Sequence, residues 1–402
     1  MIVISIDGLM PDAYLDPDAH GLKIPTLRSL VANGASARVH GVMPTVTYPS
    51  HTTMVTGVAP AVHGIVSNKP LDPLGKNYDG WRWYAEDIAV PTIYGAVEAQ
   101  HRPTALIVWP VSVGARVTYL VPEYWRAGGP DDQKLIRALS TPGAFTGLPA
   151  TLWDSLTPPD IKDPSQFAIL DHVLATVHPD LVLMHVFELD DAQHDHGPWS
   201  PEAKAVIERV DTALGKLVER LATERATLLI VSDHGFAPIE HELRLGVLFD
   251  QAHLLHDKTA DVASLASGGT ALIHVLDPKR AADIDAALAP IADHIARRID
   301  HDELVRLGGD PAASFALVAR PGYGFSDAHT GDAITATGPH GTHGWPPDDP
   351  AMAASLIAYG PGIPHTSLGT VDMTQIAPTL ARWLAVPLPT ATAAPIAALV
   401  TP

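Results

Sequence analysis

Short apolar runs rich in β-branched residues alternate along this chain with longer segments of helical periodicity. Each run is almost continuously apolar, which is typical of parallel strands covered on both faces. We predict strands over Ile2–Ile6, Thr104–Trp109, Leu181–Val186, Thr227–Val231 and Ser355–Ala358. We predict helices over Pro201–Ala222, which Ser200 would cap, and over Thr374–Leu384. The alternation predicts an α/β fold in which helices sandwich a doubly wound, mostly parallel sheet.

A stretch from about residue 252 to residue 328 shows a different pattern. Its predicted elements are two strands and one amphipathic helix, namely Ala271–Leu276, Phe315–Ala319 and Ala281–Arg297. We interpret this stretch as a small α+β cap, inserted into a catalytic core made of residues 1–251 and 329–402. Outside it, Asn68–Ala89 is predicted to be rich in loops, and the tail from Pro387 is predicted to be irregular.

Composition narrows the possible partners. With 46% hydrophobic and only 18% charged residues, the 402-residue chain can bury a sizeable core and does not resemble a disordered protein. A net charge of −19 argues against a stable nucleic-acid partner, which needs a basic surface. A small anionic substrate remains compatible, because bound metal cations reverse the local potential. We expect no membrane span, since no run approaches the ~20 apolar residues that one requires.

The composition and the N-terminus say less about the compartment. The chain has no cysteine, which excludes disulfides and thiolate metal sites but fits a cytosolic and a periplasmic protein equally well. Met1 leads directly into the first predicted strand, without the basic and apolar regions of a signal peptide. We therefore expect a cytoplasmic protein, or a periplasmic or secreted one if a signal peptide was removed. Oligomeric state is not predicted.

Acidic and imidazole side chains follow several of the apolar runs. Asp7 comes directly after the first run and precedes Gly8, and the tetrapeptide Ser232-Asp233-His234-Gly235 follows another. In open α/β sheets, ligands bind outside the carboxyl ends of the strands. These residues are therefore candidate metal ligands. Asp7 alone would fit an ordinary turn better, whereas adjacent Asp and His behind four apolar residues are the more specific signal.

Two further clusters are more ambiguous. Asp190 and His194 are four residues apart, which puts them on one side of a helical turn. Asp191, Asp195 and His196 crowd the same stretch, which would also suit a solvated polar loop. His343 lies in a glycine-rich segment where His340 competes for the same role, and a surface loop is the plain alternative.

A candidate nucleophile lies in the segment Pro44–His51. Thr47 needs an activating partner, because a free hydroxyl is a poor nucleophile, and a metal can supply the activation. Thr45, Ser50 and Thr52 are rival hydroxyls, and the alternative role for Thr47 is to cap a helix over His51–Val58. About six Asp and His ligands suffice for two divalent transition metals, with one position left for a nucleophile. A non-catalytic zinc-binding protein would share the same acidic, His-rich composition.

Taken together, these motifs resemble the alkaline phosphatase superfamily, and within it the nucleotide pyrophosphatase/phosphodiesterase (type I phosphodiesterase) family in its bacterial branch. The resemblance covers nearly the whole chain. It rests on Ile4–Gly8, Pro44–His51, Val55–Asn68, Ser232–Gly235 and His343-Gly344-Trp345. The segment after the nucleophile departs from the family pattern Phe-Pro-Asn-His, because it reads Tyr48-Pro49-Ser50-His51.

The resemblance implies a ligand set and a mechanism. One Zn²⁺ would be held by Asp190, His194 and His343, and the other by Asp7, Asp233 and His234 together with Thr47. Manganese or iron would also accept these nitrogen and oxygen ligands. Thr47 would attack phosphorus and form a covalent phosphothreonine, while the Asn68 side chain and a backbone N–H near Thr47 stabilise the phosphoryl oxygens. The implied reaction is hydrolysis of a phosphodiester or phosphoanhydride bond in a small phosphate ester or a nucleotide.

The choice between diester and monoester rests on fewer residues. A dianionic monoester favours an added cation, and no Arg occurs between Thr47 and Asn68, so a monoanionic diester fits better. Lys69 keeps a phosphomonoesterase or phosphonate hydrolase open as the nearest alternative. A sulfatase with a modified Cys nucleophile is excluded by the absence of Cys. The candidates for a substrate-binding wall, which would equally suit the core, are Trp81, Trp83, Tyr84 and Trp109.

Overall fold

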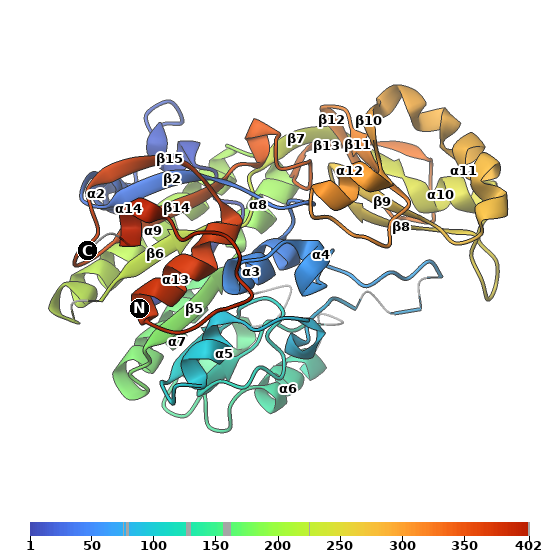
Figure 1. Ribbon diagram of the computed structural model, residues 1–402. Coiled ribbons are helices and arrows are strands. Elements are labelled where there is room, and N and C mark those ends of the chain that lie inside the picture. Colours follow the sequence, from blue (N-terminus) through green and yellow to red (C-terminus); the bar gives the residue numbers. More distant parts are fainter. Residues whose placement is uncertain (75, 78–79, 126–129, 156–161, 225, 401–402) are drawn as a thin grey trace.

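The computed structural model describes residues 1–402 except 75, 78–79, 126–129, 156–161, 225 and 401–402. Its central sheet has eight strands (Figure 1). In spatial order they are β15 (Thr366–Asp372), β2 (Ala35–His40), β14 (Ala354–Tyr359), β6 (Leu228–Val231), β1 (Ile2–Ile6), β5 (Leu181–Val186), β3 (Thr104–Ile107) and β4 (Tyr119–Val121). Within this sheet, only β14 runs antiparallel to its neighbours. The predicted mostly parallel α/β sheet is therefore confirmed.

Helices cover both faces of this sheet because its strands are apolar on both sides. Ile2, Ile4 and Ile6 point into one core layer, whereas Val3 points into the other. The first layer packs against α2 (Pro25–Ala32), α7 (Asp163–Thr176) and α9 (Pro201–Glu224). The second packs against α3 (Thr47–Thr56), α5 (Ile93–Glu98) and α13 (Ile376–Leu384). Burying such strands on both faces provides the main driving force for the sandwich.

A second lobe lies at the right of Figure 1 and has its own hydrophobic core. One of its sheets is antiparallel, in the order β10 (Ile295–Asp300), β11 (Phe315–Ala319), β9 (Thr270–Val275) and β8 (Val262–Ser267). The other consists of β12 (Gly322–Ser326), β7 (Ala237–Arg244) and β13 (Ile334–Thr342). β12 lies inside the predicted cap, but β7 and β13 lie outside its predicted limits. The division of the chain at residues 252 and 328 stays a prediction.

Shorter elements complete the described fold. The helices are α1 (Asp12–Leu15), α4 (Pro60–His63), α6 (Pro130–Leu139), α8 (Glu188–His196), α10 (Leu245–Gln251), α11 (Ala281–Leu288), α12 (His301–Arg306) and α14 (Ala397–Val400). The 3-10 segments are η1 (Ala85–Asp87), η2 (Ala150–Ser155), η3 (Pro278–Arg280), η4 (Ala289–His294), η5 (Pro350–Met352) and η6 (Met373–Gln375). Among the described residues, none of the helices combines the length and apolarity that a bilayer span requires.

The structure corrects two local predictions and removes one alternative interpretation of Thr47. The helix predicted over Ala281–Arg297 ends at Leu288, because Pro290 cannot continue its hydrogen bonding, and the chain then forms η4 and strand β10. The strand predicted over Thr104–Trp109 ends at Ile107, because Val108 has a positive φ of 52°. Thr47 is the first residue of α3 rather than the cap of a helix over His51–Val58.

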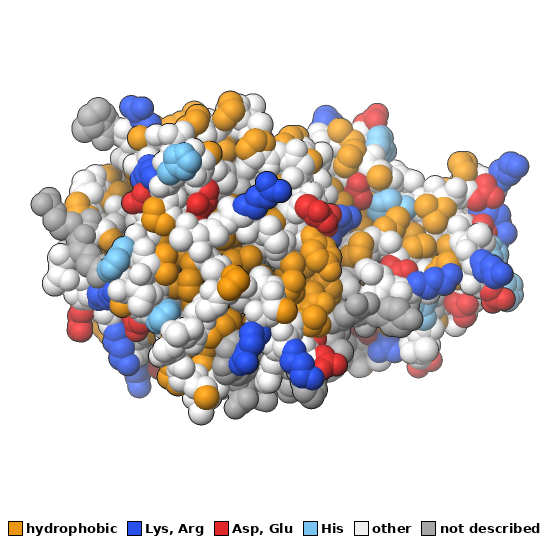
Figure 2. All heavy atoms as spheres, turned by 90° about the horizontal axis from the view of Figure 1, so that it is seen from below, with side chains coloured by type: hydrophobic (Ala, Val, Ile, Leu, Met, Phe, Trp, Pro, Cys, Tyr) orange, Lys and Arg blue, Asp and Glu red, His pale blue; other side chains and the backbone are white. Residues whose placement is uncertain are grey.

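Two loop predictions hold over the described residues. Asn68–Ala89 is largely irregular, apart from η1, with residues 75, 78 and 79 lying outside the described part. The tail from Pro387 is irregular apart from α14. On the face shown in Figure 2, Lys and Arg side chains are scattered among acidic and hydrophobic ones rather than gathered in one basic patch.

Candidate metal centre

The predicted ligands meet at the carboxyl edge of the central sheet. Asp7 follows β1 directly, Asp190 and His194 lie on α8 behind β5, and Asp233 and His234 follow β6. His343 arrives from the second lobe, directly after β13. The exit from β1 depends on Gly8, which has a φ of +67°, and a Cβ there would lie 2.7 Å from Gln193 Nε2. The parallel topology therefore gathers side chains that are far apart in the sequence.

Asp7, Asp233 and His234 form one compact group. One potential ligand atom from each residue lies within 4.8 Å of the other two. His234 Nε2 is 3.3 Å from Asp7 Oδ1 and 3.2 Å from Asp233 Oδ2. All three residues are buried. Two carboxylate oxygens and one imidazole nitrogen at this spacing suit a divalent transition metal.

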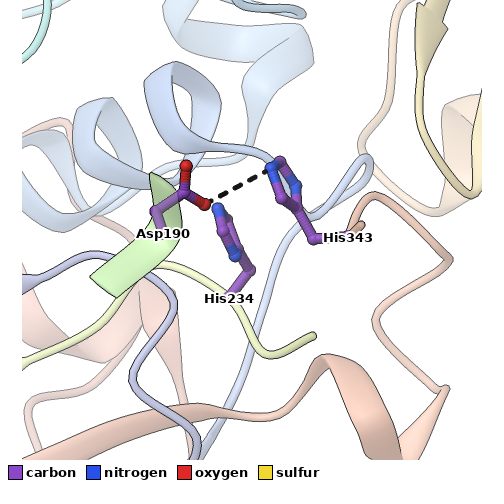
Figure 3. Close-up of side chains that lie close together, drawn as sticks. All are labelled: Asp190, His234 and His343. Atoms are coloured by element: carbon purple, nitrogen blue, oxygen red, sulfur yellow. Dashed lines mark ion pairs between the residues drawn. The ribbon is translucent and has the colours of Figure 1, made fainter. Parts of the chain in front are cut away.

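A second group, adjacent to the first, contains Asp190, His234 and His343, again with ligand atoms within 4.8 Å (Figure 3). His343 Nε2 lies 3.8 Å from Asp190 Oδ1, and the His343 ring stacks on that of His234 with centroids 3.6 Å apart. The family resemblance gives His194, not His234, to this metal. His194 Nε2 does lie 3.5 Å from Asp190 Oδ2, although His194 is not part of the compact group. The division of ligands between two metals stays a prediction.

The imidazoles of His194, His234 and His343 each place Nδ1 at a backbone carbonyl oxygen. Nδ1 of His194 is 3.0 Å from the Gly341 carbonyl, Nδ1 of His234 is 3.1 Å from that of Gly235, and Nδ1 of His343 is 3.1 Å from that of Thr45. Because a carbonyl only accepts, each Nδ1 carries the proton, and each Nε2 keeps its lone pair for a metal. Burial lowers the pKa of all three imidazoles, that of His234 to about 3, so they are neutral near pH 7.

The carboxylates of Asp7, Asp190 and Asp233 lie close together, and several of their oxygens have no hydrogen-bond partner. Asp7 Oδ1, Asp190 Oδ1, Asp233 Oδ2 and His234 Nε2 are buried and lack a hydrogen-bond partner. Burial first, and then neighbouring carboxylates, raise the pKa of Asp7 and of Asp190 well above the ordinary value. Within the described part of the chain, the ion pairs of these three aspartates are all with imidazoles. Buried, unpartnered acceptors of this kind fit bound cations, which would satisfy them.

Thr47 faces the same space. It lines a hollow of about 490 Å³ together with Asp7, Asp190 and His194. The rival hydroxyls lie elsewhere, because Thr45 Oγ1 donates to the Trp345 carbonyl, Thr52 Oγ1 donates to the Tyr48 carbonyl, and Ser50 is fully buried. Among the hydroxyls considered, Thr47 alone lines the hollow that contains the acidic groups.

Asn68 lies beside the nucleophile position. Its Oδ1 accepts a hydrogen bond of 2.8 Å from the backbone N–H of Tyr48. This contact fixes the amide and leaves its NH₂ group as a donor for a ligand. The N–H of Tyr48, a candidate for stabilising a phosphoryl oxygen, is engaged by Asn68 in this structure.

Of the aromatic residues predicted for a substrate wall, Trp81 lines the hollow. Trp109 is buried against His51 with ring centroids 4.9 Å apart. Tyr84 is 43% exposed and lines a different depression, which Trp81 and the largely buried Trp83 also line. Lys69 lines a neighbouring cavity, and its Nζ is 5.9 Å from the centroid of the Trp81 ring.

Four further residues line the hollow and were not singled out from the sequence. They are Glu123, Trp125, His185 and Phe187. The signal for His185 was available, since a lone imidazole interrupts the apolar run Leu181–Val186. Glu123 and Trp125 follow the three-residue strand β4, which is too short to stand out as a periodic pattern.

An α/β fold with two groups of Asp and His side chains at the carboxyl edge of its sheet agrees with the class that the resemblance implies, the alkaline phosphatase superfamily. The family model described as "Type I phosphodiesterase / nucleotide pyrophosphatase" matches residues 1–346, so the chain belongs to this family. The structure is similar to that of murine ectonucleotide pyrophosphatase/phosphodiesterase 5, with a TM-score of 0.70 and 21% identity, covering 96% of this chain and 95% of that one. The structural likeness supports the fold.

Two curated relatives illustrate the sequence similarity. A fission yeast protein named as an uncharacterized pyrophosphatase/phosphodiesterase is 31% identical over 261 residues, which cover 59% of this chain and 45% of that protein. The bovine bis(5'-adenosyl)-triphosphatase ENPP4 is 25% identical over 400 residues, covering 93% of this chain and 76% of that protein. The chain thus matches less than half the length of the yeast relative.

Proposed function

We propose that this protein is a two-metal phosphodiesterase/nucleotide pyrophosphatase that works through a covalent phosphothreonine. The observation that carries the proposal is the position of Thr47, which lines one hollow together with Asp7 and Asp190 from the two metal-ligand groups. Family membership supports a phosphodiester or phosphoanhydride substrate. The bovine relative bears the name of a bis(5'-adenosyl)-triphosphatase, and an inactive threonine-to-alanine variant of murine ENPP5 was solved with AMP.

Zinc is the metal we propose for both sites, held by Asp7, Asp233, His234, Asp190, His194 and His343. Manganese and iron remain chemically compatible with nitrogen and oxygen ligands. Two divalent cations bound here would acidify the Thr47 hydroxyl and neutralise charge on the oxygens around phosphorus. The neutral Nε2 atoms and unpartnered carboxylate oxygens of this chain support such binding.

The chain's own groups supply the rest of the reaction. Thr47 Oγ gives its proton to solvent water and attacks phosphorus in line, so that the Oγ–P bond forms while the bond to the leaving oxygen breaks and that oxygen takes a proton from water. The Asn68 NH₂ group donates to a non-bridging oxygen. A water molecule then attacks phosphorus from the side that the leaving group vacated, which breaks the Oγ–P bond and restores Thr47. The products are an alcohol or a phosphate from the leaving side and a phosphomonoester from the other.

The lining of the hollow favours a diester over a monoester. Among the described residues that line it there is no Lys or Arg, the side chains that would best supply the extra positive charge that a dianionic monoester prefers. Trp81, Trp125 and Phe187 form an aromatic wall, with the rings of Trp81 and Trp125 edge to face and centroids 5.4 Å apart. A nucleoside or aryl group would stack on such a wall.

Substrate comparison with matched threonine variants tests this proposal. We expect zinc-loaded protein to hydrolyse bis-p-nitrophenyl phosphate and dinucleoside polyphosphates faster than p-nitrophenyl phosphate or phosphonoacetate. Thr47→Ala should keep its zinc and lose at least about a thousandfold in kcat. The control Thr56→Ala removes a hydroxyl that bonds the Thr52 carbonyl on the same helix, and it should remain active.

Other outcomes point to other functions. Faster turnover of the monoester or of phosphonoacetate would identify a phosphomonoesterase or phosphonate hydrolase instead. Zinc binding without turnover of any of these substrates would indicate a non-catalytic zinc-binding protein. Full activity of Thr47→Ala would refute the covalent mechanism.

A further inference from the structure

A buried chain of hydrogen bonds runs from the metal-ligand groups to the residue after the nucleophile. His185 Nε2 is 3.0 Å from Asp7 Oδ2, and His185 Nδ1 is 2.9 Å from Glu123 Oε2. The Tyr48 hydroxyl donates to Glu123 Oε1 over 2.7 Å. All four residues are buried, with at most 3% of each exposed. Solvent therefore does not substitute for any of these contacts.

One end of this chain of hydrogen bonds determines which oxygen Asp7 offers to the metal. Because His185 occupies Oδ2, Asp7 is left with Oδ1, the oxygen that lies 3.3 Å from His234 Nε2 and has no hydrogen-bond partner. The ring of His185 is itself held in place, since Glu123 accepts from its other nitrogen and the rings of His51 and Phe187 pack 4.5 and 5.3 Å away. Outer contacts of this kind fix the orientation of a ligand.

The other end holds the first turn of α3. Tyr48 follows Thr47 directly, and while its hydroxyl bonds Glu123, its backbone N–H donates to Asn68 Oδ1. A shift of Tyr48 would therefore move the nucleophile and the amide that faces the phosphoryl group together. Small displacements of reacting groups are costly, since a misplacement of about 1 Å lowers rates by roughly a hundredfold.

We propose that His185, Glu123 and the Tyr48 hydroxyl are positioning residues, which set the ligand oxygen of Asp7 and the place of Thr47 through one continuous chain. The inference rests on the proposed function, because it assumes a metal at Asp7 and a nucleophile at Thr47. It adds residues that touch neither the metal nor the substrate phosphorus but act through those that do.

Two conservative variants test the role of this chain of hydrogen bonds. Glu123→Gln keeps the size of the side chain but turns one acceptor oxygen into an NH₂ group, which faces a donor. Tyr48→Phe removes a single hydroxyl. The matched controls alter two other buried contacts that involve none of the metal-ligand residues. Asp310→Asn alters a buried carboxylate 2.9 Å from His274 Nε2 in the second lobe, and Tyr119→Phe removes a hydroxyl that donates to the Ala144 carbonyl over 2.7 Å.

The measurements are zinc affinity by competition with a chelating dye, and kcat and KM for bis-p-nitrophenyl phosphate at saturating zinc. We expect Glu123→Gln to lose about 10- to 100-fold in zinc affinity. Tyr48→Phe should lose less affinity. At saturating zinc, both variants should keep a lowered kcat with nearly unchanged KM, because the nucleophile remains misplaced. Asp310→Asn and Tyr119→Phe should match the wild type in zinc affinity and kcat, whatever their thermal stability.

The outcomes separate this inference from the proposed function. If the wild type binds zinc and hydrolyses the diester, but Glu123→Gln and Tyr48→Phe match it in zinc affinity and kcat, the inference is wrong and the function stands. If the wild type binds no zinc, both are wrong. Should Glu123→Gln fail to fold, Tyr48→Phe decides alone, because the loss of one hydroxyl leaves the packing of the ring in place.

Discussion

Zinc-dependent stability should reveal how many metals the folded protein binds. The structure contains two overlapping ligand groups, so two ions should bind the native state and leave the unfolded chain. Each bound ion then adds about 1.4 kcal/mol of stability for every tenfold rise in free zinc above its Kd. With an unfolding entropy of about 2.1 cal/mol/K per residue, a chain of 402 residues has a total of roughly 0.8 kcal/mol/K. Two ions should therefore raise Tm by about 3 °C per decade of free zinc, and one ion by about 1.6 °C.

The assay is thermal unfolding in metal-buffered solutions that cover several decades of free zinc. We expect the two-ion slope for the wild type and the one-ion slope for Asp190→Asn, which removes a ligand found only in the second group. Asp211→Asn is the control, because its buried carboxylate accepts backbone N–H groups of Thr26 and Leu27 and belongs to neither metal-ligand group. A wild-type Tm that does not depend on zinc would refute the reasoning.

Three further predictions concern single side chains. Burial lowers the pKa of His63 to about 3, so its contribution to stability is present above its unfolded pKa near 6.5 and is lost as pH falls from there toward 3. His63→Gln should therefore reduce the slope of unfolding free energy against pH in this acid range by up to about 1.4 kcal/mol per pH unit. An unchanged slope in denaturant titrations would contradict this. Gly8→Ala should lower the free energy of unfolding by about 1–2 kcal/mol for its left-handed φ, and by more because the new Cβ clashes with Gln193. The loss should be larger than that of Gly21→Ala, since Gly21 has a similar φ but open space around it. Equal losses would show that the clash is absent. Trp125→Ala should raise KM for nucleoside and aryl diesters about tenfold, while leaving KM for a methyl diester nearly unchanged, and a uniform effect would remove the stacking role.

The central sheet could be predicted because its strands carry a strong local signal. β1 and β5 have the predicted limits, β6 begins one residue later than predicted, and β14 is one residue longer at each end, since continuous apolar runs mark buried strands. Where the signal was weaker, prediction failed. The segment after Leu288 has apolar residues that fit a helix or a strand, and its pairing with β11 decided the outcome.

The candidate metal ligands could be predicted from the sequence for a related reason. Asp7 and Asp233 lie next to strand ends, and the topology of a parallel sheet brings such positions together. His185 and Glu123 could not be chosen in this way, because the role proposed for them depends on a contact between β5 and the segment after β4, and these two strands are not neighbours in the sheet. Trp81 lines the hollow and Trp109 is buried in the core, a difference that could not be predicted because both are aromatic residues in the sequence.

Anomalous diffraction at the zinc absorption edge, on crystals of zinc-loaded protein, tests most directly whether these side chains hold a metal pair beside Thr47. We predict two peaks about 4 Å apart, as in other two-metal sites. One should lie among Asp7, Asp233 and His234 within bonding distance of Thr47 Oγ, and the other should contact Asp190 and His343. A single peak, or a pair of peaks out of reach of Thr47, would contradict the account.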